Sequence, residues 1–347
     1  MIKDLEGHRI HLTKEGNGHM LVLGNSGQGK TYFLCRMLEK YCEERKKVLI
    51  LDFSGSYSQT ELHEKKFKYP ERVRRYNLTN GKFCWMYRAS SQEMVAGDLN
   101  DALLCCLHIN SYFQKKLLFD AVIKVLRKSD GLIFPLLIDE IVDMLEKEDI
   151  EETVAGNRDN LGRILTRLSP FEYVKSLKIS RKNTTGEVSD PIVILDLSGF
   201  PDSQRKFLTE FLLCLLWKEL YRADFPNRCD ILVLDEMQFL SLKEGSTLAT
   251  IMRECRKRKL EVVLSTQFIG NYDKSELRAL QQVDHTVIFR PTPEEYKKTT
   301  QMISLENIKA WERIVRELKR GEAILKGFYT LDNQSKVLNA PILLEIE

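Results

Sequence analysis

Short apolar runs alternate along the chain with longer stretches in which apolar residues recur every three or four positions. The short runs end at a glycine or a polar residue, as His19–Leu23 does before Gly24. A continuous apolar run bounded in this way is typical of a strand buried on both faces of a parallel sheet. We therefore expect strands at residues 19–23, 47–53, 192–197, 231–234, 261–265 and 284–289.

The stretches between these runs have helical spacing. In the first of them, Phe33, Leu34, Met37 and Leu38 share one face of a helix. Strands that alternate with helices of this length predict an α/β fold with a mostly parallel sheet and helices on both faces. The helices expected in this part of the chain are residues 31–44, 203–222 and 246–259.

One long stretch interrupts the alternation. Residues 98–148 and 158–175 are mostly helical by their apolar spacing, and Asn183–Gly186 has the composition of a turn. We interpret this stretch as an insertion between core strands. The expected division is a core of residues 1–58 and 190–347 and a mostly helical insertion of residues 59–189.

The first candidate for chemistry follows the first strand. Residues 24–31 match the pattern G-x-x-x-x-G-K-[ST] at every fixed position, and they lie between an apolar run and a helix. Glycines at these positions allow a tight loop whose backbone N–H groups can surround phosphate oxygens, helped by the positive end of the next helix. Lys30 is expected to reach the β- and γ-phosphates, and Thr31 to bind Mg²⁺. The expected nucleotide-binding set is Gly24, Asn25, Ser26, Gly27, Gln28, Gly29, Lys30, Thr31 and Tyr32.

The second candidate is a pair of carboxylates at the end of an apolar run, Asp235 and Glu236. In a parallel sheet the carboxyl ends of the strands face the same crevice as the phosphate loop. Asp235 is then placed to support Mg²⁺, and Glu236 to orient and polarise the attacking water. Asp139 and Glu140 also end an apolar run, but the residues that follow them have the spacing of an amphipathic helix. We therefore favour Asp235 and Glu236.

Two further strand ends carry polar residues. Thr266 and Gln267 follow the run at 261–265, where either side chain could contact the γ-phosphate or the attacking water. The alternative is an ordinary strand exit with a surface amide. Asp196 ends the run at 192–195, where a capping role for the next turn competes with a role in positioning Mg²⁺.

A basic cluster precedes the strand at 261–265. Arg253 and Arg256 are three residues apart and would share one helix face. In oligomeric ATPases an arginine from a neighbouring subunit can stabilise the charge of the transition state. The alternative is a solvated basic helix end, which the helix dipole favours.

Composition adds little to this picture. Hydrophobic residues make up 43% and charged residues 30% of the 347 residues, as in ordinary globular proteins. The net charge of +3 is too small to indicate nucleic-acid binding by itself, although the charges cluster. The eight cysteines lack the spacing of a metal site and fit free thiols in a reducing compartment. With no apolar run long enough to span a membrane and no signal-peptide pattern, we expect a cytoplasmic protein.

Taken in order, these motifs resemble those of the HerA/FtsK superfamily of P-loop ATPases, above all its HerA-like and conjugation-type members. Ser56 stands where the family has an acidic residue, and Met237 where it has alanine. The ordered set is more specific than the phosphate loop alone. The matching segments are Gly24–Thr31, Leu49–Tyr57, Ile194–Gly199, Asp235–Gln238, Arg253–Lys257, Ser265–Gln267 and Gly321–Leu325.

The resemblance implies a RecA-like P-loop NTPase fold that hydrolyses ATP with Mg²⁺. It implies Glu236 as catalytic base, Gln267 as γ-phosphate sensor, and Arg253 or Arg256 as an arginine finger acting on a neighbouring copy. It also implies a ring, usually a hexamer, that moves double-stranded DNA. Only 18 residues precede the first strand, so neither the N-terminal β-barrel of HerA-like proteins nor a membrane anchor is expected.

Three functions are therefore considered. The first is a DNA-translocating motor. The second is an ATP-driven scaffold or switch that organises a partner effector, for example a nuclease, in a defence or mobile-element system. The third is a kinase on the same fold, which Asp235, Glu236 and Gln267 argue against, because a kinase transfers phosphate to a bound substrate and needs no water-orienting glutamate.

Overall fold

The computed structural model describes residues 2–151, 157–181, 191–222, 228–332 and 336–346. The chain forms two compact units, each built from segments that are distant in sequence. Unit 1 comprises Met1–Arg75, Asp190–Leu195 and Cys229–Glu347, and unit 2 comprises Tyr76–Ser189 and Asp196–Arg228.

Unit 1 is built on a large sheet with the strand order β1-β14-β12-β11-β3-β10-β9-β4-β8-β5. The pairs β11·β3, β3·β10, β10·β9 and β9·β4 are parallel. The neighbours β12, β14 and β1 extend this sheet in antiparallel fashion. The strands are β1 (Ile2–Asp4), β3 (Met20–Leu23), β4 (Val48–Asp52), β5 (Val73–Asn77), β8 (Ile192–Asp196), β9 (Ile231–Leu234), β10 (Glu261–Thr266), β11 (His285–Phe289), β12 (Glu322–Gly327) and β14 (Ile342–Ile346), with β2 (Ile10–Leu12) and β13 (Tyr329–Leu331) as a separate antiparallel pair.

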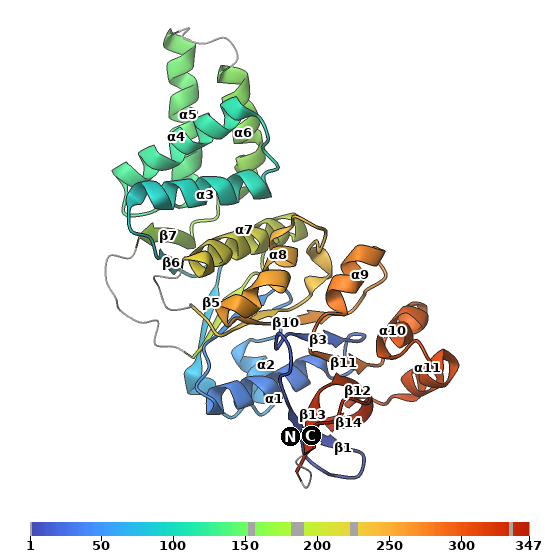
Figure 1. Cartoon of the computed structure of the whole chain (residues 1–347). Coiled ribbons are helices and arrows are strands. Elements are labelled where there is room, and N and C mark those ends of the chain that lie inside the picture. The colour runs from blue at the N-terminus through green and yellow to red at the C-terminus, as the bar shows by residue number, and fades with distance from the viewer. Residues whose placement is uncertain (1, 152–156, 182–190, 223–227, 333–335, 347) are drawn as a thin grey trace. The chain divides into compact units, whose positions relative to one another are not determined.

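Helices cover both faces of this sheet (Figure 1). Helix α1 packs Phe33, Met37 and Tyr41 against alternate strand residues such as Val22 and Ile50 in one continuous core. A right-handed crossover from β3 to β4 places α1 on one face, and the crossovers β9–β10 and β10–β11 run the other way and place α8 and α9 on the opposite face. The helices of unit 1 are α1 (Lys30–Glu43), α2 (Gln59–Glu64), α8 (Thr247–Glu254), α9 (Lys274–Leu280), α10 (Tyr296–Ile303) and α11 (Ile308–Glu317), with 3-10 turns at Pro70–Arg72, Met237–Phe239, Cys255–Arg258 and Pro293–Glu295.

Unit 2 is mostly helical, with one parallel pair of strands (Figure 1). Its interior holds an aromatic cluster in which the rings of Phe134, Phe171, Phe207 and Phe211 lie 4.1–6.1 Å apart, centroid to centroid. Its elements are β6 (Phe83–Tyr87), α3 (Gln92–Cys106), α4 (Tyr112–Lys128), α5 (Phe134–Glu151), α6 (Asn157–Leu168), a 3-10 turn at Ser169–Phe171, β7 (Leu177–Arg181) and α7 (Asp202–Tyr221).

Two helices differ from the sequence expectation in their ends. The helix expected at 246–259 is α-helical only to Glu254 and continues as a 3-10 turn, and the helix expected at 158–175 ends at Leu168 because Pro170 follows. The turn expected at Asn183–Gly186 lies outside the described residues.

The compact units do not follow the expected division of the chain. Residues 59–75 lie in unit 1 with the sheet, and residues 196–228, including all of α7, lie in unit 2. As a division into a catalytic core and an insertion, the expected boundaries remain a prediction. Within the described ranges, no helix combines the length and apolar character needed to cross a bilayer.

Candidate functional site

Polar residues converge at the carboxyl edge of the parallel strands in unit 1. The register pairs Leu23 with Thr266, and Leu234 with both Leu264 and Leu51. The residues that follow these strand ends therefore leave the sheet at nearly the same level. This register brings the phosphate loop together with Asp235 and Gln267, both of which are more than 200 residues from the loop in sequence.

The loop between β3 and α1 depends on glycine at its first position. Gly24 has φ of +151°, and a Cβ there would lie 2.6 Å from the Cβ of Phe289. Any side chain would therefore clash with β11. The loop is tied to both neighbouring strands, since the Gly24 N–H donates to the Thr266 carbonyl at 3.3 Å and the Asn25 N–H to the Arg290 carbonyl at 2.9 Å.

Lys30 begins α1 and turns back over the loop. Its Nζ donates to the carbonyl oxygens of Gly24 at 2.8 Å and Asn25 at 3.2 Å. Burial lowers the pKa of this ammonium, and the negative charges of Glu236 and Asp235 oppose that shift. A buried cation facing two carboxylates across a loop of backbone N–H groups is suited to hold an anionic ligand.

Asp235 follows β9 and is buried. Its Oδ2 accepts a hydrogen bond from Ser54 Oγ at 2.7 Å, and Ser54 lies just beyond the end of β4. Burial, aided by the charge of Glu236, raises the pKa of Asp235, whereas the Ser54 hydrogen bond and Lys30 lower it. Ser54 was not among the expected site residues, although its place two residues after a strand end was a usable signal.

Glu236 has a left-handed backbone, with φ of 58° and ψ of 47°. Neighbouring residues in a strand face opposite sides, but this turn lets Asp235 and Glu236 line the same pocket. A left-handed residue other than glycine costs about 1–2 kcal/mol and is often found where function requires it.

The Glu236 carboxylate is held at both oxygens by side-chain amides. Gln267 Nε2 donates to Oε1 at 2.5 Å, and Gln238 Nε2 donates to Oε2. Gln238 is fixed in turn, since its Oε1 accepts from Thr266 Oγ1 at 2.9 Å. The amides orient the carboxylate without neutralising it. Gln267 therefore contacts Glu236 directly, a contact the sequence did not predict. Gln238 lies in the matching segment Asp235–Gln238, but no role was predicted for its side chain.

Glu236 and Gln267, with Asp235 and part of the phosphate loop, line a cavity of about 650 Å³, a size typical of nucleotide-sized ligands. Of the expected residues, Ser26, Gly27, Gly29, Lys30, Thr31, Tyr32, Asp235, Glu236 and Gln267 line it. The sequence did not predict the remaining lining residues, which come from the α2 region and the antiparallel strands: Ser56, Glu61, Glu64, Lys65, Arg320, Gly321 and Ile346.

Arg253 and Arg256 are not among the lining residues. They lie at the end of α8 and in the next 3-10 turn, before β10 begins, whereas Gln267 follows the end of β10. Six residues of strand separate the two levels by roughly 20 Å. The arginines of one chain therefore lie at the amino edge of the sheet, away from that chain's own phosphate loop.

A buried histidine anchors this basic segment. His19 precedes β3 at the amino edge, its Nδ1 accepts from the Val262 N–H at 3.2 Å, and its Nε2 lies 3.2 Å from the Met252 carbonyl and 3.3 Å from Cys255 Sγ. The first contact needs an unprotonated Nδ1 and the second a protonated Nε2. Burial lowers the pKa of His19, which favours this neutral form.

The other carboxylate candidates lie in unit 2. Asp139 is exposed on α5, and Glu140 is buried beside Lys128 and Lys124. Asp139 and Glu140 therefore lie on a helix and not at the end of a strand. Asp196 accepts from Ser198 N at 3.0 Å and Ser198 Oγ at 2.7 Å, which is the capping geometry.

The residues at the cavity suit a nucleotide with its divalent cation. A loop of backbone donors and one lysine match phosphate oxygens, and a threonine hydroxyl with a carboxylate matches the oxygen ligands that Mg²⁺ prefers. Thr31 and Asp235 would hold the ion.

Residues 9–216, more than half of the chain, match the family model described as the central domain of helicase HerA. No curated protein sequence matches the chain.

The fold is similar to that of VirB4 of Thermoanaerobacter pseudethanolicus, with TM-score 0.69 and 16% identity over 99% of this chain and 95% of that one. It is also similar to the bacterial conjugative coupling protein TrwB, with TM-score 0.63 and 15% identity over 95% of this chain and 86% of that one. A structure of TrwB with ADP and Mg²⁺ matches with TM-score 0.62 and 14% identity over the same shares.

Proposed function

The chain is a P-loop ATPase that belongs to the family of the HerA central domain, and from that premise we propose that it is a Mg²⁺-dependent, ring-forming motor that couples ATP hydrolysis to the movement of double-stranded DNA. The observation that carries the hydrolytic part is the Glu236 carboxylate, held by Gln267 and Gln238 on the cavity that Lys30 also lines.

The residues take the following roles. The loop amides and Lys30 bind and orient the phosphates. Thr31 and Asp235 would hold Mg²⁺, which would supply positive charge to the phosphate oxygens when bound. Glu236 accepts a hydrogen bond from the attacking water and turns its oxygen toward the γ-phosphate. Gln267 links this carboxylate to β10, so that a change at the γ-phosphate is passed to the strand.

The arginines act between copies of the chain. Arg253 and Arg256 lie about one strand length from the cavity of their own chain. In a ring, the amino edge of one subunit can face the cavity of the next, and an arginine there stabilises the transition-state charge. Because this arginine comes from the neighbouring subunit, the rate of ATP hydrolysis should depend on assembly of the ring. The ring is proposed to be a hexamer, as the resemblance to the HerA/FtsK superfamily implies.

The DNA part is supported by the family and by the similar structures, a helicase domain and a conjugative coupling protein. It is tested by measuring ATP turnover with and without double-stranded DNA at two salt concentrations. A motor that contacts DNA phosphates should be stimulated by DNA, and the stimulation should fall as salt rises. Turnover that ignores DNA but rises with a partner protein, for example a nuclease, would replace the motor with the ATP-driven switch.

A further inference from the structure

Part of the nucleotide cavity is left without a role by the chemistry described above. The phosphates, Mg²⁺ and the attacking water take the phosphate loop, the two carboxylates that follow β9, and Gln267. A nucleotide also carries a ribose and a base, which must lie against the rest of the lining. The lining residues that have no role so far are Tyr32, Ser56, Glu61, Glu64, Lys65, Arg320, Gly321 and Ile346.

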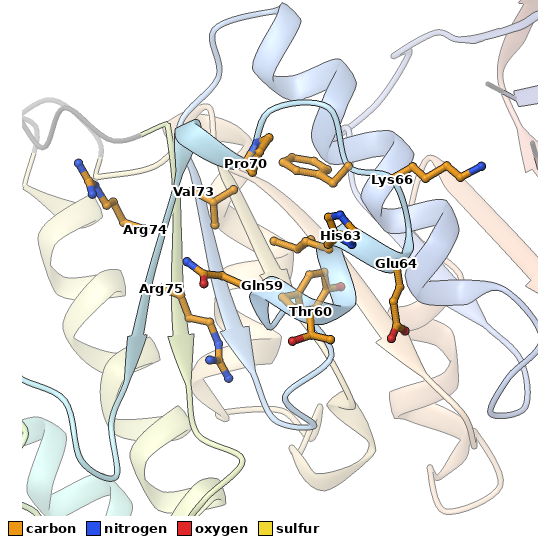
Figure 2. Close-up of a pocket in the computed structure, with 12 residues that line it drawn as sticks. Gln59, Thr60, His63, Glu64, Lys66, Pro70, Val73, Arg74 and Arg75 are labelled. Carbon is orange, nitrogen blue, oxygen red and sulfur yellow. The ribbon is translucent and has the colours of Figure 1, made fainter.

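The larger cavity of unit 1 offers no better place for the base. It is a groove of about 1150 Å³ between α2 and β5 (Figure 2). Among the described residues, none that lines this groove belongs to the phosphate loop, and Glu64 is the one that also lines the nucleotide cavity. A base whose phosphates lie in the loop is therefore expected within the nucleotide cavity itself.

Tyr32 offers the flattest apolar surface in the nucleotide cavity. Of the described residues that line it, only Tyr32 and Ile346 have large apolar side chains, and only Tyr32 is aromatic. Ile346 is buried, whereas Tyr32 is half-buried. The flat face of a purine or pyrimidine stacks favourably on an aromatic ring. Tyr32 is therefore the lining residue best suited to hold a base.

The direction of α1 places this ring beside the phosphate loop. α1 begins at Lys30, so Tyr32 lies in its first turn. Side chains on a helix lean toward its N-terminus and cover the turn before their own Cα. The segment that precedes the first turn of α1 is the phosphate loop. A base stacked on the Tyr32 ring can therefore belong to the same molecule whose phosphates the loop holds.

A guanidinium covers one face of the Tyr32 ring. Arg36 lies one turn further along α1, and its Cζ is 4.7 Å from the centre of the ring. Arg36 is not among the lining residues of the nucleotide cavity and instead borders a separate cavity beside β2. The guanidinium therefore lies on the face of the ring away from the nucleotide cavity, and the other face is left for a ligand.

Arg36 is itself held by two neighbours. Its Nη1 donates to Glu39 Oε1 at 2.6 Å, and its Nη2 donates to the Lys65 carbonyl. Glu39 is buried and also accepts from the Lys68 N–H at 3.0 Å. Breaking a buried ion pair leaves a buried charge without a partner, so the pair has few other arrangements. The guanidinium therefore holds the Tyr32 ring in one orientation.

We propose that Tyr32 is the platform on which the nucleotide base stacks, and that Arg36 is the positioning residue that holds this ring. The proposal rests on the proposed nucleotide site, but not on DNA movement or ring assembly. The end of α2 takes part, because the Lys65 carbonyl holds Arg36 while the Lys65 side chain lines the cavity. Since stacking strengthens with ring area, the platform should favour purines over pyrimidines.

The test compares ligands with and without a base on the full chain, by titration calorimetry with Mg²⁺. ADP and inorganic tripolyphosphate both offer phosphates to the loop, but only ADP has a base. Tyr32→Ala should weaken ADP binding about tenfold and leave tripolyphosphate binding unchanged. Tyr32→Phe keeps the ring and should bind ADP as the unchanged chain does. ADP should bind more tightly than UDP, and Tyr32→Ala should reduce that preference.

Tyr69 provides the matched control. Its ring also lies against an arginine, with Arg72 Cζ 5.5 Å from the ring centre, but it does not line the nucleotide cavity. Tyr69→Ala should therefore leave both affinities unchanged.

Arg36→Lys tests the positioning residue. It keeps a cation for Glu39 but loses the flat guanidinium, so ADP binding should weaken about threefold while tripolyphosphate binding stays the same. A fraction of misfolded protein would lower the amount that binds both ligands alike, so the ratio of the two affinities separates stacking from folding.

Four results would overturn the proposal. Unchanged ADP affinity in Tyr32→Ala, or an equal loss of ADP and tripolyphosphate affinity there, would exclude the platform. An equal loss of ADP affinity in Tyr69→Ala would assign the effect to the packing around α1. Unchanged ADP affinity in Arg36→Lys would remove the role of Arg36. A failure of the nucleotide site itself looks different, because the unchanged chain would then bind neither ADP nor tripolyphosphate.

Discussion

The two edges of the parallel sheet in unit 1 differ in what they hold. At the carboxyl edge, the phosphate loop, Asp235, Glu236 and Gln267 line one cavity, where Ser54 donates to Asp235 at 2.7 Å and Gln267 donates to Glu236 at 2.5 Å. At the amino edge, the basic segment from Arg253 to Lys259 lies beside His19, and none of its residues lines that cavity. Under the proposed function, the two edges are complementary halves of one site that meet between copies of the chain.

The largest effect is expected from breaking the carboxyl edge. Lys30→Ala should abolish nucleotide binding or turnover, because the buried ammonium is the main positive charge facing the phosphates.

Glu236→Gln should keep ATP bound while turnover falls about 10²–10⁴-fold, since the amide cannot accept the water's proton. Nucleotide binding is read by fluorescence of a labelled analogue and turnover by phosphate release. Turnover close to that of the unchanged chain in Glu236→Gln would refute the assignment of the base, and Glu244→Gln, at an exposed position, is the matched control.

The next effect tests whether the two edges meet between copies. The double variant Arg253→Ala, Arg256→Ala should lower turnover about 10³-fold while leaving nucleotide affinity nearly unchanged, because the arginines act on a neighbour's transition state. Mixing it with Glu236→Gln copies should restore part of the activity. In the mixture, an intact cavity can receive an intact arginine.

The control is a mixture of Glu236→Gln with Lys30→Ala copies. Both changes break the same half of the site, so mixing should restore nothing. Recovery in the control, or none in the first mixture, would mean that the site is not shared. The single arginine variants then decide whether Arg253 or Arg256 is the finger.

The comparison of the two edges also separates what the sequence could predict from what it could not. The phosphate loop and Asp235 follow strands with strong apolar runs, and a parallel sheet gathers such strand ends whatever their separation in sequence. The end of α8 was less predictable, because the change to a 3-10 turn at Cys255 leaves no periodic signal in four residues. Arg320 and Ile346 reach the cavity through antiparallel strands, and no local pattern predicts that pairing.

Similar limits apply to the contacts within the site. The sequence placed Glu236 at a strand exit, but the left-handed turn and the amide contacts from Gln267 and Gln238 depend on tertiary packing. His19 read as the first residue of an apolar run. Its contacts with Val262 and Met252 join segments more than 200 residues away, and a lone histidine gives no sign of them.

A smaller loss of turnover and of stability is expected from a change at His19, which tests the part that the amino edge plays. His19→Ala removes a fully buried ring and leaves the Val262 N–H without its partner, so the free energy of unfolding should fall by about 2–4 kcal/mol. Turnover should fall more than nucleotide affinity does, since the basic segment loses its anchor. Urea unfolding and ATPase assays on the same samples measure both, with the exposed His11→Ala as control. A loss of stability with unchanged turnover would make His19 structural only.

The smallest effect is a gain in stability at the carboxyl edge. Burial raises the pKa of Asp235 above its ordinary value, so the folded state is weakened as pH rises through that pKa and the carboxylate ionises. Asp235→Asn should therefore raise the free energy of unfolding at neutral pH by about 1 kcal/mol, or the midpoint by roughly 2–4 °C, while abolishing turnover. This gain in the free energy of unfolding should shrink as pH falls toward the ordinary pKa of aspartate. There the side chain of the folded state is neutral in both the unchanged chain and Asp235→Asn.

Asp52 provides the contrast on the neighbouring strand. It is also fully buried, but its carboxylate accepts from the N–H groups of Gly55, Ser56 and Tyr57 at 2.8–3.2 Å. Asp52→Asn should therefore lower the free energy of unfolding by about 1–3 kcal/mol, since an amide cannot accept all three bonds. Calorimetry of both variants across pH measures whether the free energy of unfolding rises in Asp235→Asn and falls in Asp52→Asn. A loss of stability in Asp235→Asn at neutral pH would contradict this prediction. It would mean that the attraction of Lys30 and the Ser54 hydrogen bond stabilise the Asp235 carboxylate by more than its burial destabilises it.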